Sequence, residues 1–482
     1  MINFRIIARV FSLLLIVEGL FMLVSAGVSF LYHEQAATAF CYSALIAIVT
    51  GILAFTPFRN EERIFGNKEG YIIITGIWII FSIFGTLPFL ISGSISNFGD
   101  AFFESMSGFT TTGATILTNI ESMSHGILFW RSLTQWLGGI GIIFISLSVI
   151  PVFKSINIQI AVIEFSGQTT DKIHPRIKDA AKRLFIIYFL LTFSEVILLV
   201  LGGMPFFDAI CHSFSTLSTG GFSTHNNGIA AFSTPYIMIV MIVFMFIAGT
   251  NMTLIYFGLK GNFKKITGNN EFVFYSLICI FFVVLVSLIL YYKSGFSAGK
   301  ALLNGAFHVV SIITTTGFYT QDYKLWGNII LIIFFILMFS GAMAGSTSGS
   351  IKIVRLLLIT KNSRQELKRI IHPNAFIPVR LDKKVIPQSI IYNLLVFITL
   401  YVFIMCLGAF LISFMGYDII TSFSTSASML GNIGPGFGTF GPFTNYSALP
   451  MAGKWIMSAM MLLGRLELLT VMVLFSRNFY SH

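Results

Sequence analysis

The stretch Glu104-Ser-Met-Ser-Gly-Phe-Thr-Thr-Thr-Gly113 decides how the chain is organised, because the chain contains it in four versions. The second runs from His212 to Gly221 and the third from His308 to Gly317. A looser fourth version, Ser426-Ala-Ser-Met-Leu-Gly-Asn-Ile-Gly434, is followed by Pro435-Gly436. Counted between their final glycines, successive versions lie 108, 96 and 117 residues apart. A hydroxyl-rich run that ends in glycine and recurs at this spacing is an internal repeat, so we expect four similar structural units.

The amino-acid composition places these units in a membrane. Hydrophobic residues make up 56% of the 482 residues, charged residues only 10%, and the mean hydropathy is +0.86. A soluble domain carries about 25% charged residues, so the sequence predicts an all-α integral membrane protein. The cysteines show no metal-ligand spacing and are interpreted as small buried thiols; they are Cys41, Cys211, Cys279 and Cys406.

Apolar runs long enough to cross about 30 Å of hydrocarbon alternate with shorter ones. Val10–Leu31 and Ala36–Pro57 form an N-terminal helix pair outside the repeat. Each repeat then reads as a crossing helix, a short helix, a glycine-ended loop and a second crossing helix. The expected crossing runs are Tyr71–Ser92, Ile127–Val152, Leu184–Gly203, Tyr236–Leu259, Phe272–Tyr292, a run from Trp326 onward, Val385–Phe414 and Met451–Phe475. The short runs are Asn97–Phe109, Phe206–Leu217, Ala301–Ile313 and Asp418–Leu430.

This layout divides the chain into five parts that should surround one central pore. They are the helix pair 1–69, repeat one 70–155, repeat two with a preceding cytoplasmic loop 156–262, repeat three with an intramembrane loop 263–362, and repeat four 363–482. Ten crossings put both termini and every loop between repeats on one side, which carries 24 of the 30 Lys and Arg residues. Such a bias marks the cytoplasmic side. Topology therefore explains the net charge of +11, and no nucleic-acid partner is expected.

The four glycine-ended loops are the candidate site. Non-helical backbone at membrane depth is tolerated only where it is buried in protein or lines a wet cavity, and rings of backbone carbonyls can replace the hydration shell of a cation. One such loop alone would be read as a helix cap and turn, but four equivalent loops favour a cation pore. The candidate ion-binding residues are Thr110, Thr111, Thr112, Gly113, Ser218, Thr219, Gly220, Gly221, Thr314, Thr315, Thr316, Gly317, Gly431, Asn432, Ile433 and Gly434.

The second crossing segment of repeat three is too long for one straight helix. Residues 326–359 would measure roughly 50 Å at 1.5 Å per residue, about 20 Å more than the bilayer core. Ser340–Ser350 consists of small residues apart from Met343, so we expect a break and a loop below the candidate filter. The alternative is a small-residue packing face of the Gly-x-x-x-Gly type at Gly341–Gly345.

Ionisable residues inside apolar runs are expensive and therefore informative. Arg465 should face the bundle interior, and Glu467 should contact a neighbouring helix because residues two apart lie on different faces. Glu18 and Glu195 are expected to have hydrogen-bonded structural roles. Glu104, His212 and His308 occupy equivalent positions and should pack behind the loops without binding metal.

Several strings together resemble the Trk/Ktr/HKT superfamily of cation transporters, in particular its TrkH type with an extra N-terminal helix pair. They are Thr110–Thr115, Pro175–Lys178, Ser218–Thr224, Gly345–Lys352, Ile371–Ala375, Asn432–Gly436 and Gly464–Glu467. The resemblance implies a potassium-selective pore in the bacterial inner membrane and a homodimer. It also implies a cytosolic ring of TrkA-like nucleotide-binding regulatory subunits. Relatives with serine at the position of Gly113 tend to pass sodium, so this glycine fits potassium.

The resemblance also assigns the loop of repeat three as an intramembrane gate beside a pore-facing arginine. The gate residues would be Gly341, Gly345, Ser346, Thr347, Ser348, Gly349 and Arg465. Potassium would be the substrate, with no cofactor held by this chain. The basic strings Lys172–Arg183 and Lys361–Lys384 would dock the regulatory ring.

Two other function classes fit the sequence less well. A sodium- or proton-coupled potassium symporter of the same fold would need broken helices or acidic residues that hold a coupling ion, and repeat three supplies only one expected break. An enzyme would need a catalytic cluster, but the chain has no His-Glu-x-x-His, Gly-x-Ser-x-Gly or P-loop motif. The sequence therefore predicts a transport protein that is not an enzyme.

Overall fold

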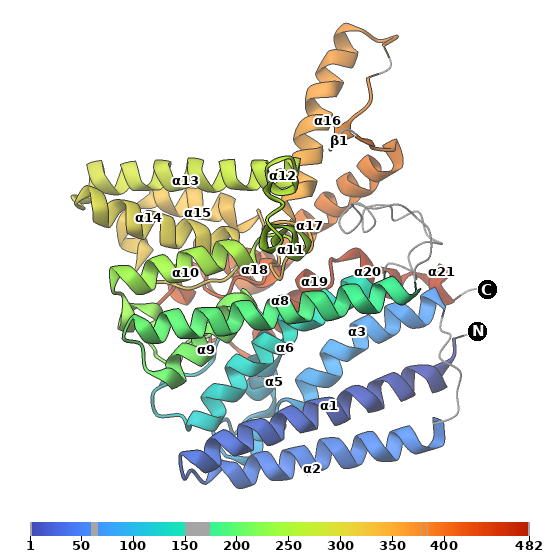
Figure 1. The fold of residues 1–482 in the computed structure, drawn as a ribbon, viewed down its shortest axis with the longest axis vertical. Helices are drawn as coiled ribbons and strands as arrows, with labels where there is room; N and C mark the ends of the chain where they lie inside the picture. Colours follow the sequence, from blue (N-terminus) through green and yellow to red (C-terminus); the bar gives the residue numbers. More distant parts are fainter. Residues whose placement is uncertain (1, 59–65, 150–173, 376, 383, 481–482) are drawn as a thin grey trace.

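The computed structural model describes residues 2–58, 66–149, 174–375, 377–382 and 384–480. In this part the only sheet is a small hairpin of β1 (Arg380–Leu381) and β2 (Lys384–Val385). Nearly everything else is helical, and most long helices run side by side (Figure 1). The N- and C-termini lie at the same end of this bundle. The predicted all-α class is confirmed.

The helices follow the predicted order. The N-terminal pair is α1 (Phe4–Leu31) and α2 (Ala36–Phe55), and α1 packs along α2. Repeat one contains α3 (Asn67–Phe84), α4 (Leu87–Ile91), α5 (Phe98–Phe109) and α6 (His125–Val149). Repeat two contains α8 (His174–Leu201), α9 (Phe206–Leu217), α10 (Pro235–Ala248), α11 (Met252–Leu259) and α12 (Phe263–Thr267).

The second half of the chain repeats this arrangement. Repeat three contains α13 (Asn270–Ser294), α14 (Ala298–Ile313), α15 (Asn328–Met338) and α16 (Ile353–Ile371). Repeat four contains α17 (Gln388–Phe414), α18 (Ile419–Gly431), α19 (Met451–Arg465), α20 (Leu469–Met472) and α21 (Arg477–Tyr480). Short 3-10 turns are η1 (Thr56–Phe58), η3 (Gly228–Phe232), η4 (Tyr323–Trp326), η5 (Gly438–Phe440) and η6 (Val473–Phe475). The exact boundaries of the five predicted parts stay predictions, and the one at 155/156 lies outside the described residues.

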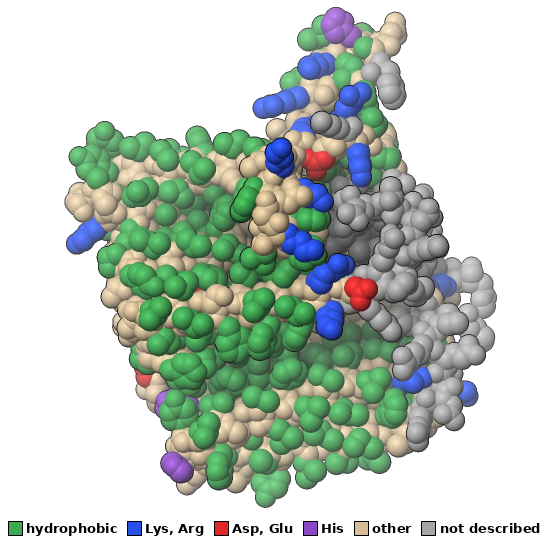
Figure 2. All heavy atoms as spheres, viewed as in Figure 1, with side chains coloured by type: hydrophobic (Ala, Val, Ile, Leu, Met, Phe, Trp, Pro, Cys, Tyr) green, Lys and Arg blue, Asp and Glu red, His purple; other side chains and the backbone are tan. Residues whose placement is uncertain are grey.

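The surface of the bundle is apolar, as a bilayer requires. Six described spans are long and apolar enough to cross a membrane: Phe4–Leu31, Ala36–Phe58, Lys68–Ile91, Ala181–Leu201, Asn270–Ser294 and Gln388–Phe414. Hydrophobic side chains cover much of the face seen in Figure 2, whereas Lys and Arg gather on α16 and toward the end that holds both termini. Cys211 and Cys279 are buried as predicted, but Cys41 and Cys406 are exposed on α2 and α17, so the buried-thiol interpretation is wrong for these two.

Second crossing segments are broken more often than the sequence suggests. The predicted break in repeat three is present, because α15 ends at Met338 and α16 begins at Ile353. Tyr236–Leu259 and Met451–Phe475, each predicted to be one helix, are wrong as single helices. The first bends by 111° between α10 and α11, and the second by 107° after Arg465. The side chain of Asn251 caps α11 by accepting from the Thr253 amide at 2.8 Å, which stabilises the first bend.

The lower helix of repeat three differs in direction and length from the prediction. Helix α16 continues to Ile371 instead of ending near residue 359, and it projects away from the bundle across the direction of the crossing helices (Figure 1). After α16 the chain returns through the β1–β2 hairpin to α17. This projection presents a charged element outside the apolar bundle.

Candidate functional site

The four short helices α5, α9, α14 and α18 end where the four candidate loops begin. Gly431, predicted as the first residue of its loop, is instead the last residue of α18. All four loops then adopt the same unusual backbone. The residue two before each final glycine is left-handed, with φ of 53° at Thr111, 54° at Thr219, 58° at Thr315 and 54° at Asn432. Left-handed non-glycine residues are costly and cluster at functional sites, so this fourfold recurrence points to a site.

The final glycines are left-handed too, and here only glycine fits. Their φ values are 81° at Gly113, 80° at Gly221, 77° at Gly317 and 103° at Gly434. A Cβ atom at Gly113 would lie 2.1 Å from the carbonyl oxygen of Gly220. An added Cβ atom at Gly221 would lie 2.0 Å from the carbonyl oxygen of Thr316. At Gly317 it would lie 1.8 Å from the carbonyl oxygen of Ile433, and at Gly434 it would lie 2.6 Å from that of Thr112. Each loop thus faces the carbonyl of the next and the fourth faces the first, so the loops close a ring.

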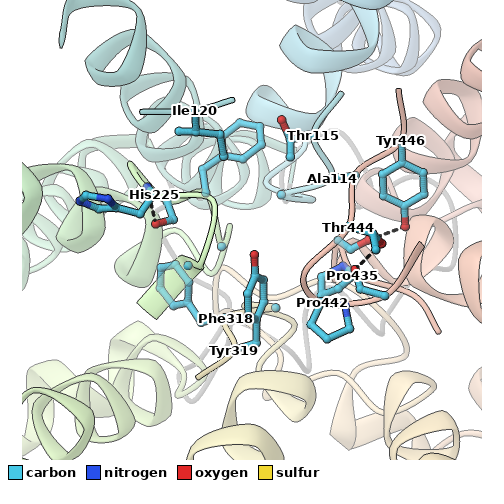
Figure 3. A pocket seen from close by; sticks show the side chains of 18 of the residues that line it. Ala114, Thr115, Ile120, His225, Phe318, Tyr319, Pro435, Pro442, Thr444 and Tyr446 are labelled. Atoms are coloured by element: carbon cyan, nitrogen blue, oxygen red, sulfur yellow. Dashed lines mark hydrogen bonds between the residues drawn. The ribbon is translucent and has the colours of Figure 1, made fainter. Parts of the chain in front are cut away.

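A cavity lies on the glycine side of this ring. Its walls include all four final glycines, and Figure 3 shows residues from all four repeats around it, among them Thr115, His225, Tyr319 and Tyr446. The Tyr446 hydroxyl donates to the carbonyl oxygen of Gly434 at 2.8 Å, which holds the fourth loop at the rim. The cavity and the ring therefore share one axis at the centre of the four repeats.

The equivalent residues Glu104, His212 and His308 lie behind the loops. Glu104 Oε2 accepts from the amide of Ile116 at 2.9 Å, and His308 Nε2 accepts from the amide of Thr320 at 3.4 Å. Both amides belong to the third residue after a final glycine. In repeat four the hydroxyl of Ser424 accepts from the equivalent amide of Phe437 at 2.8 Å, while His212 contacts the Ser223 hydroxyl at 3.0 Å.

These side chains therefore bind the segments that follow the final glycines of the loops. No group of three or more His, Cys, Asp or Glu residues that could hold a metal ion occurs in the described ranges.

Sequence reasoning missed the partner of Glu104. Arg131 of α6 donates from Nε to Glu104 Oε1 at 2.8 Å, and both side chains are buried. The guanidinium also donates to the carbonyl oxygen of Ser223 at 3.1 Å and lies 4.2 Å from the centre of the Phe222 ring. The only available signal was a charged residue within the apolar run Ile127–Val152. This pair ties repeat one to the loop of repeat two.

Replacing Glu104 by leucine should destabilise the protein strongly. The change leaves the Arg131 charge buried without its carboxylate, and breaking a buried pair in this way costs about 3–5 kcal/mol. Thermal unfolding in detergent should show a much lower midpoint for Glu104→Leu. Glu104→Leu combined with Arg131→Met should recover most of the loss, because an apolar pair replaces both charges. An equal midpoint in the double and single variants would contradict this account of the pair.

The segment between α15 and α16 lies on the other side of the ring. The Gly349 amide donates to the Thr315 hydroxyl at 2.8 Å, and the Thr347 hydroxyl donates to the Leu217 carbonyl at 3.0 Å. A Cβ atom at Gly349 would come within 2.4 Å of the Gly431 oxygen. Within the segment, the Gly341 amide donates to the carbonyl oxygen of Ile351 at 2.8 Å. The hydroxyls of Ser346 and Ser348 lie 2.9 Å apart. The segment therefore touches three of the four loop regions from beneath.

Arg465 joins this segment to another repeat. It is 2% exposed, its Nη1 donates to the carbonyl oxygen of Thr347 at 2.6 Å, and its Nη2 donates to that of Gly138 in α6 at 3.0 Å. The predicted gate residues Gly341, Thr347, Gly349 and Arg465 are thus together beneath the ring. Gly345, between Gly341 and Thr347, contacts α11 instead, because its carbonyl oxygen accepts from the Met252 amide at 3.3 Å.

Other charged side chains anchor the same segment. Glu271 of α13 accepts from the Ala344 amide at 2.7 Å, and Lys352 donates to Ser348. Glu467 pairs with Arg355 of α16, which confirms the expected contact with a neighbouring helix. Glu195 is buried near Thr216 of α9, but neither of its carboxylate oxygens has a hydrogen-bond partner among the described residues, so its expected hydrogen-bonded role is wrong. Glu18 is buried with no hydrogen-bond partner among the described residues, so its expected hydrogen-bonded role is wrong.

These features define a class: a multi-pass membrane protein whose four helix–loop–helix repeats bring backbone carbonyls together around a central axis. The family model of TrkH cation transport proteins matches residues 36–481, and the chain belongs to this family. A family of transporters also means that the chain is not an enzyme.

Individual relatives match the chain over nearly its full length. It is 36% identical over 482 residues to the Trk system potassium uptake protein TrkH of Salmonella typhimurium, covering 99% of each chain. It is 31% identical to the Trk system potassium uptake protein TrkG of Escherichia coli, covering 99% of this chain and 98% of that one. The crystal structure of the potassium transporter TrkH from Vibrio parahaemolyticus superposes with a TM-score of 0.91 at 32% identity, covering 99% of this chain and all of that one.

Proposed function

We propose that the chain takes up potassium ions through the ring formed by its four loops. The observation that carries this proposal is the closed order of contacts, in which each final glycine faces the carbonyl of the next loop. Carbonyl rings of this kind can replace the hydration shell of a cation. The short helices α5, α9, α14 and α18 end at the ring, and their partly negative C-termini favour a cation there. The potassium-uptake names of the relatives support the choice of ion.

The proposed filter consists of Thr110–Gly113, Ser218–Gly221, Thr314–Gly317 and Gly431–Gly434. Its backbone carbonyls would be the ligands, with potassium as the substrate. Hydroxyls behind the ring support its shape, since the hydroxyls of Thr110 and Thr112 lie 2.8 Å apart and those of Thr314 and Thr316 also lie 2.8 Å apart. Asn432 Nδ2 donates to the Thr112 hydroxyl at 3.0 Å and joins loop four to loop one.

The loop between α15 and α16 is proposed as the gate, and the structure as described fits a closed state. An ion leaving the ring on the side away from the cavity meets Thr347 and Gly349, which hydrogen-bond to the loop regions above them. The Arg465 charge lies beside Thr347, where it would repel a cation. Opening would require this loop to leave the axis.

Rubidium uptake into proteoliposomes tests the proposed function. The purified protein should take up rubidium, potassium should compete strongly, and sodium should compete weakly. Uptake that sodium and potassium suppress equally would overturn the assignment of potassium selectivity.

A sodium- or proton-coupled symporter remains the second candidate, and the extra bends favour keeping it. Broken helices hold coupling ions in many transporters, and here second crossing segments are broken in repeats two, three and four. The two candidates differ in energetics. Rubidium accumulation that follows an imposed sodium or proton gradient, at zero rubidium gradient, would favour the symporter; uptake that follows only the rubidium gradient and membrane potential would favour the channel.

We propose that α16 and the hairpin dock a TrkA-like nucleotide-binding regulatory ring. A groove there is lined by Lys361, Arg364, Lys368 and Arg380. Beside it the apolar side chains of Leu367, Ile370 and Ile371 are 63%, 75% and 71% exposed on a helix that projects from the bundle. Basic and apolar groups together fit a partner with an acidic, partly apolar surface. In the other predicted docking string, Lys172–Arg183, residues 172–173 lie outside the described residues.

Charge reversal in this groove should weaken docking. Lys361→Glu, Arg364→Glu and Lys368→Glu together should reduce the affinity for a TrkA-like subunit by about tenfold or more, because facing like charges costs several kcal/mol. Co-purification and equilibrium binding measure the effect. Lys293→Glu with Lys300→Glu, placed outside α16 and the hairpin, is the matched control. If the triple variant and the control variant bind the TrkA-like subunit with equal affinity, the proposed surface is wrong.

The proposed setting is the bacterial inner membrane, with both termini in the cytoplasm. Both termini lie at one end of the bundle, near the side where basic side chains gather (Figures 1 and 2), which supports this orientation. A homodimer is also proposed, as the family resemblance implies.

A further inference from the structure

The loop of repeat two lacks a side chain that the other three loops have. The position before the final glycine is Thr112 in repeat one, Thr316 in repeat three and Ile433 in repeat four, but Gly220 in repeat two. Gly220 is not left-handed, so its backbone does not require glycine. The reason for glycine must therefore lie in what surrounds it.

The side-chain amide of Gln135 occupies the missing place. A Cβ atom at Gly220 would lie 2.4 Å from Gln135 Cδ and 2.5 Å from its Oε1. Gln135 belongs to α6 of repeat one and is fully buried. Its Nε2 donates to the carbonyl oxygen of Gly220 at 2.7 Å, and its Oε1 accepts from the amide of Phe222 at 3.1 Å. The amide thus holds the backbone on both sides of Gly221.

This contact makes the ring unequal. The four ring carbonyls belong to Thr112, Gly220, Thr316 and Ile433. Within the described ranges, only the Gly220 carbonyl among these four accepts a hydrogen bond. A carbonyl oxygen has two lone pairs, so one can accept from Gln135 while the other stays free for an ion. The hydrogen bond fixes the direction of this carbonyl, and the positive N–H group beside the oxygen weakens the negative field that an ion meets there.

We infer that Gln135 is a positioning residue that sets the ion selectivity of the filter from outside the four loops. Selectivity depends on the number and field strength of the carbonyls and on how firmly they are held. Gln135 controls both at one quarter of the ring. The inference rests on the proposed function, and it adds a selectivity determinant that lies 85 residues from the backbone it holds.

The test compares rubidium uptake and sodium competition in proteoliposomes for three variants and the unsubstituted protein. Gln135→Met keeps the length of the side chain but loses both hydrogen bonds, and should lower the preference for rubidium over sodium by about tenfold. Gln135→Glu keeps the acceptor for Phe222 but, once the carboxyl is ionised, has no donor for Gly220, so it should lose preference as well at a pH that ionises it. Gln135→Ala with Gly220→Thr supplies the threonine of loops one and three in the vacated space, and should regain most of the preference.

The outcomes separate the inference from the proposed function. Absence of any preference in the unsubstituted protein would overturn the proposed function itself. A selective unsubstituted protein together with an equally selective Gln135→Met variant would overturn only the role of Gln135. Should Gln135→Met fail to fold, the other two variants decide together: a folded Gln135→Glu protein with lowered preference beside a selective double variant supports the inference, and a folded Gln135→Glu protein as selective as the unsubstituted one contradicts it. A purely structural role would change the amount of folded protein and leave the ion preference of the folded fraction intact.

Discussion

Gly113→Ser is expected to remove most of the discrimination between potassium and sodium. A serine Cβ would lie 2.1 Å from the carbonyl oxygen of Gly220, well inside contact distance, and it would have to adopt a φ of 81°. The oxygen must move, and the loop of repeat two moves with it. Losing one quarter of the ring geometry should lower the selectivity by tenfold or more, since about 1.4 kcal/mol corresponds to a factor of ten. Sodium competition against rubidium uptake measures this directly.

A matched control separates the clash from backbone strain. Gly93 and Gly203 are also left-handed, with φ of 72° and 90°, but a Cβ at either position meets nothing within 4 Å. Gly93→Ser and Gly203→Ser should therefore cost stability and leave the ion preference unchanged. A Gly113→Ser protein that discriminates as well as these controls would show that the ring does not select the ion.

Arg465→Ala should raise potassium flux in the absence of any regulatory partner. The substitution removes two hydrogen bonds from a charged donor, one to Thr347 and one to Gly138, each worth roughly 1.5–3 kcal/mol. It also removes the positive charge beneath the ring. If the closed state loses even one of these contributions, the open fraction should rise by about tenfold or more. Rubidium uptake without the partner, compared at equal amounts of inserted protein, reports the change.

Lys454→Ala is the control for losing a buried cation on the same helix. Lys454 lies in α19 as Arg465 does, but its ammonium donates to Asp100 at 2.7 Å, and this partner lies outside the gate segment. Lys454→Ala should therefore leave the basal flux unchanged.

Deleting Ser346–Ser348 should act like Arg465→Ala, because the deletion removes Thr347 from beneath the ring. Unchanged flux in both gate variants would make Arg465 a structural tie and place the gate elsewhere.

The sequence predicted the architecture because repetition and hydropathy both act over long stretches. The fourfold recurrence of a glycine-ended run, together with spans of the right length, defined the repeats before any contact was known. The small residues Ser340–Ser350 likewise predicted the break in repeat three. The bend after Arg465 could not be predicted in this way. Its left-handed residues are Glu467 and Leu468, with φ of 57° and 36°, and neither is a residue type that favours this conformation.

The side chains that support the site were harder to predict than the loops. Gln135 and Arg131 act on the loop of repeat two, 85 and 92 residues away, and nothing local in the sequence joins these positions. Gly220 was assigned to the filter for its place in the repeat, yet its lack of a side chain is explained only by the Gln135 amide that fills the space. Partners that meet only in the folded bundle leave no periodic pattern, so structure is needed to find them.

The most direct test of the central claim is a crystal structure of the purified protein grown in rubidium, with anomalous scattering recorded at the rubidium edge. We expect a peak on the axis, surrounded by the carbonyl oxygens of Thr112, Gly220, Thr316 and Ile433. Replacing rubidium by sodium should remove it. An anomalous peak that lies outside the four loops, with none on the axis between them, would contradict the claim that these carbonyls bind the transported ion.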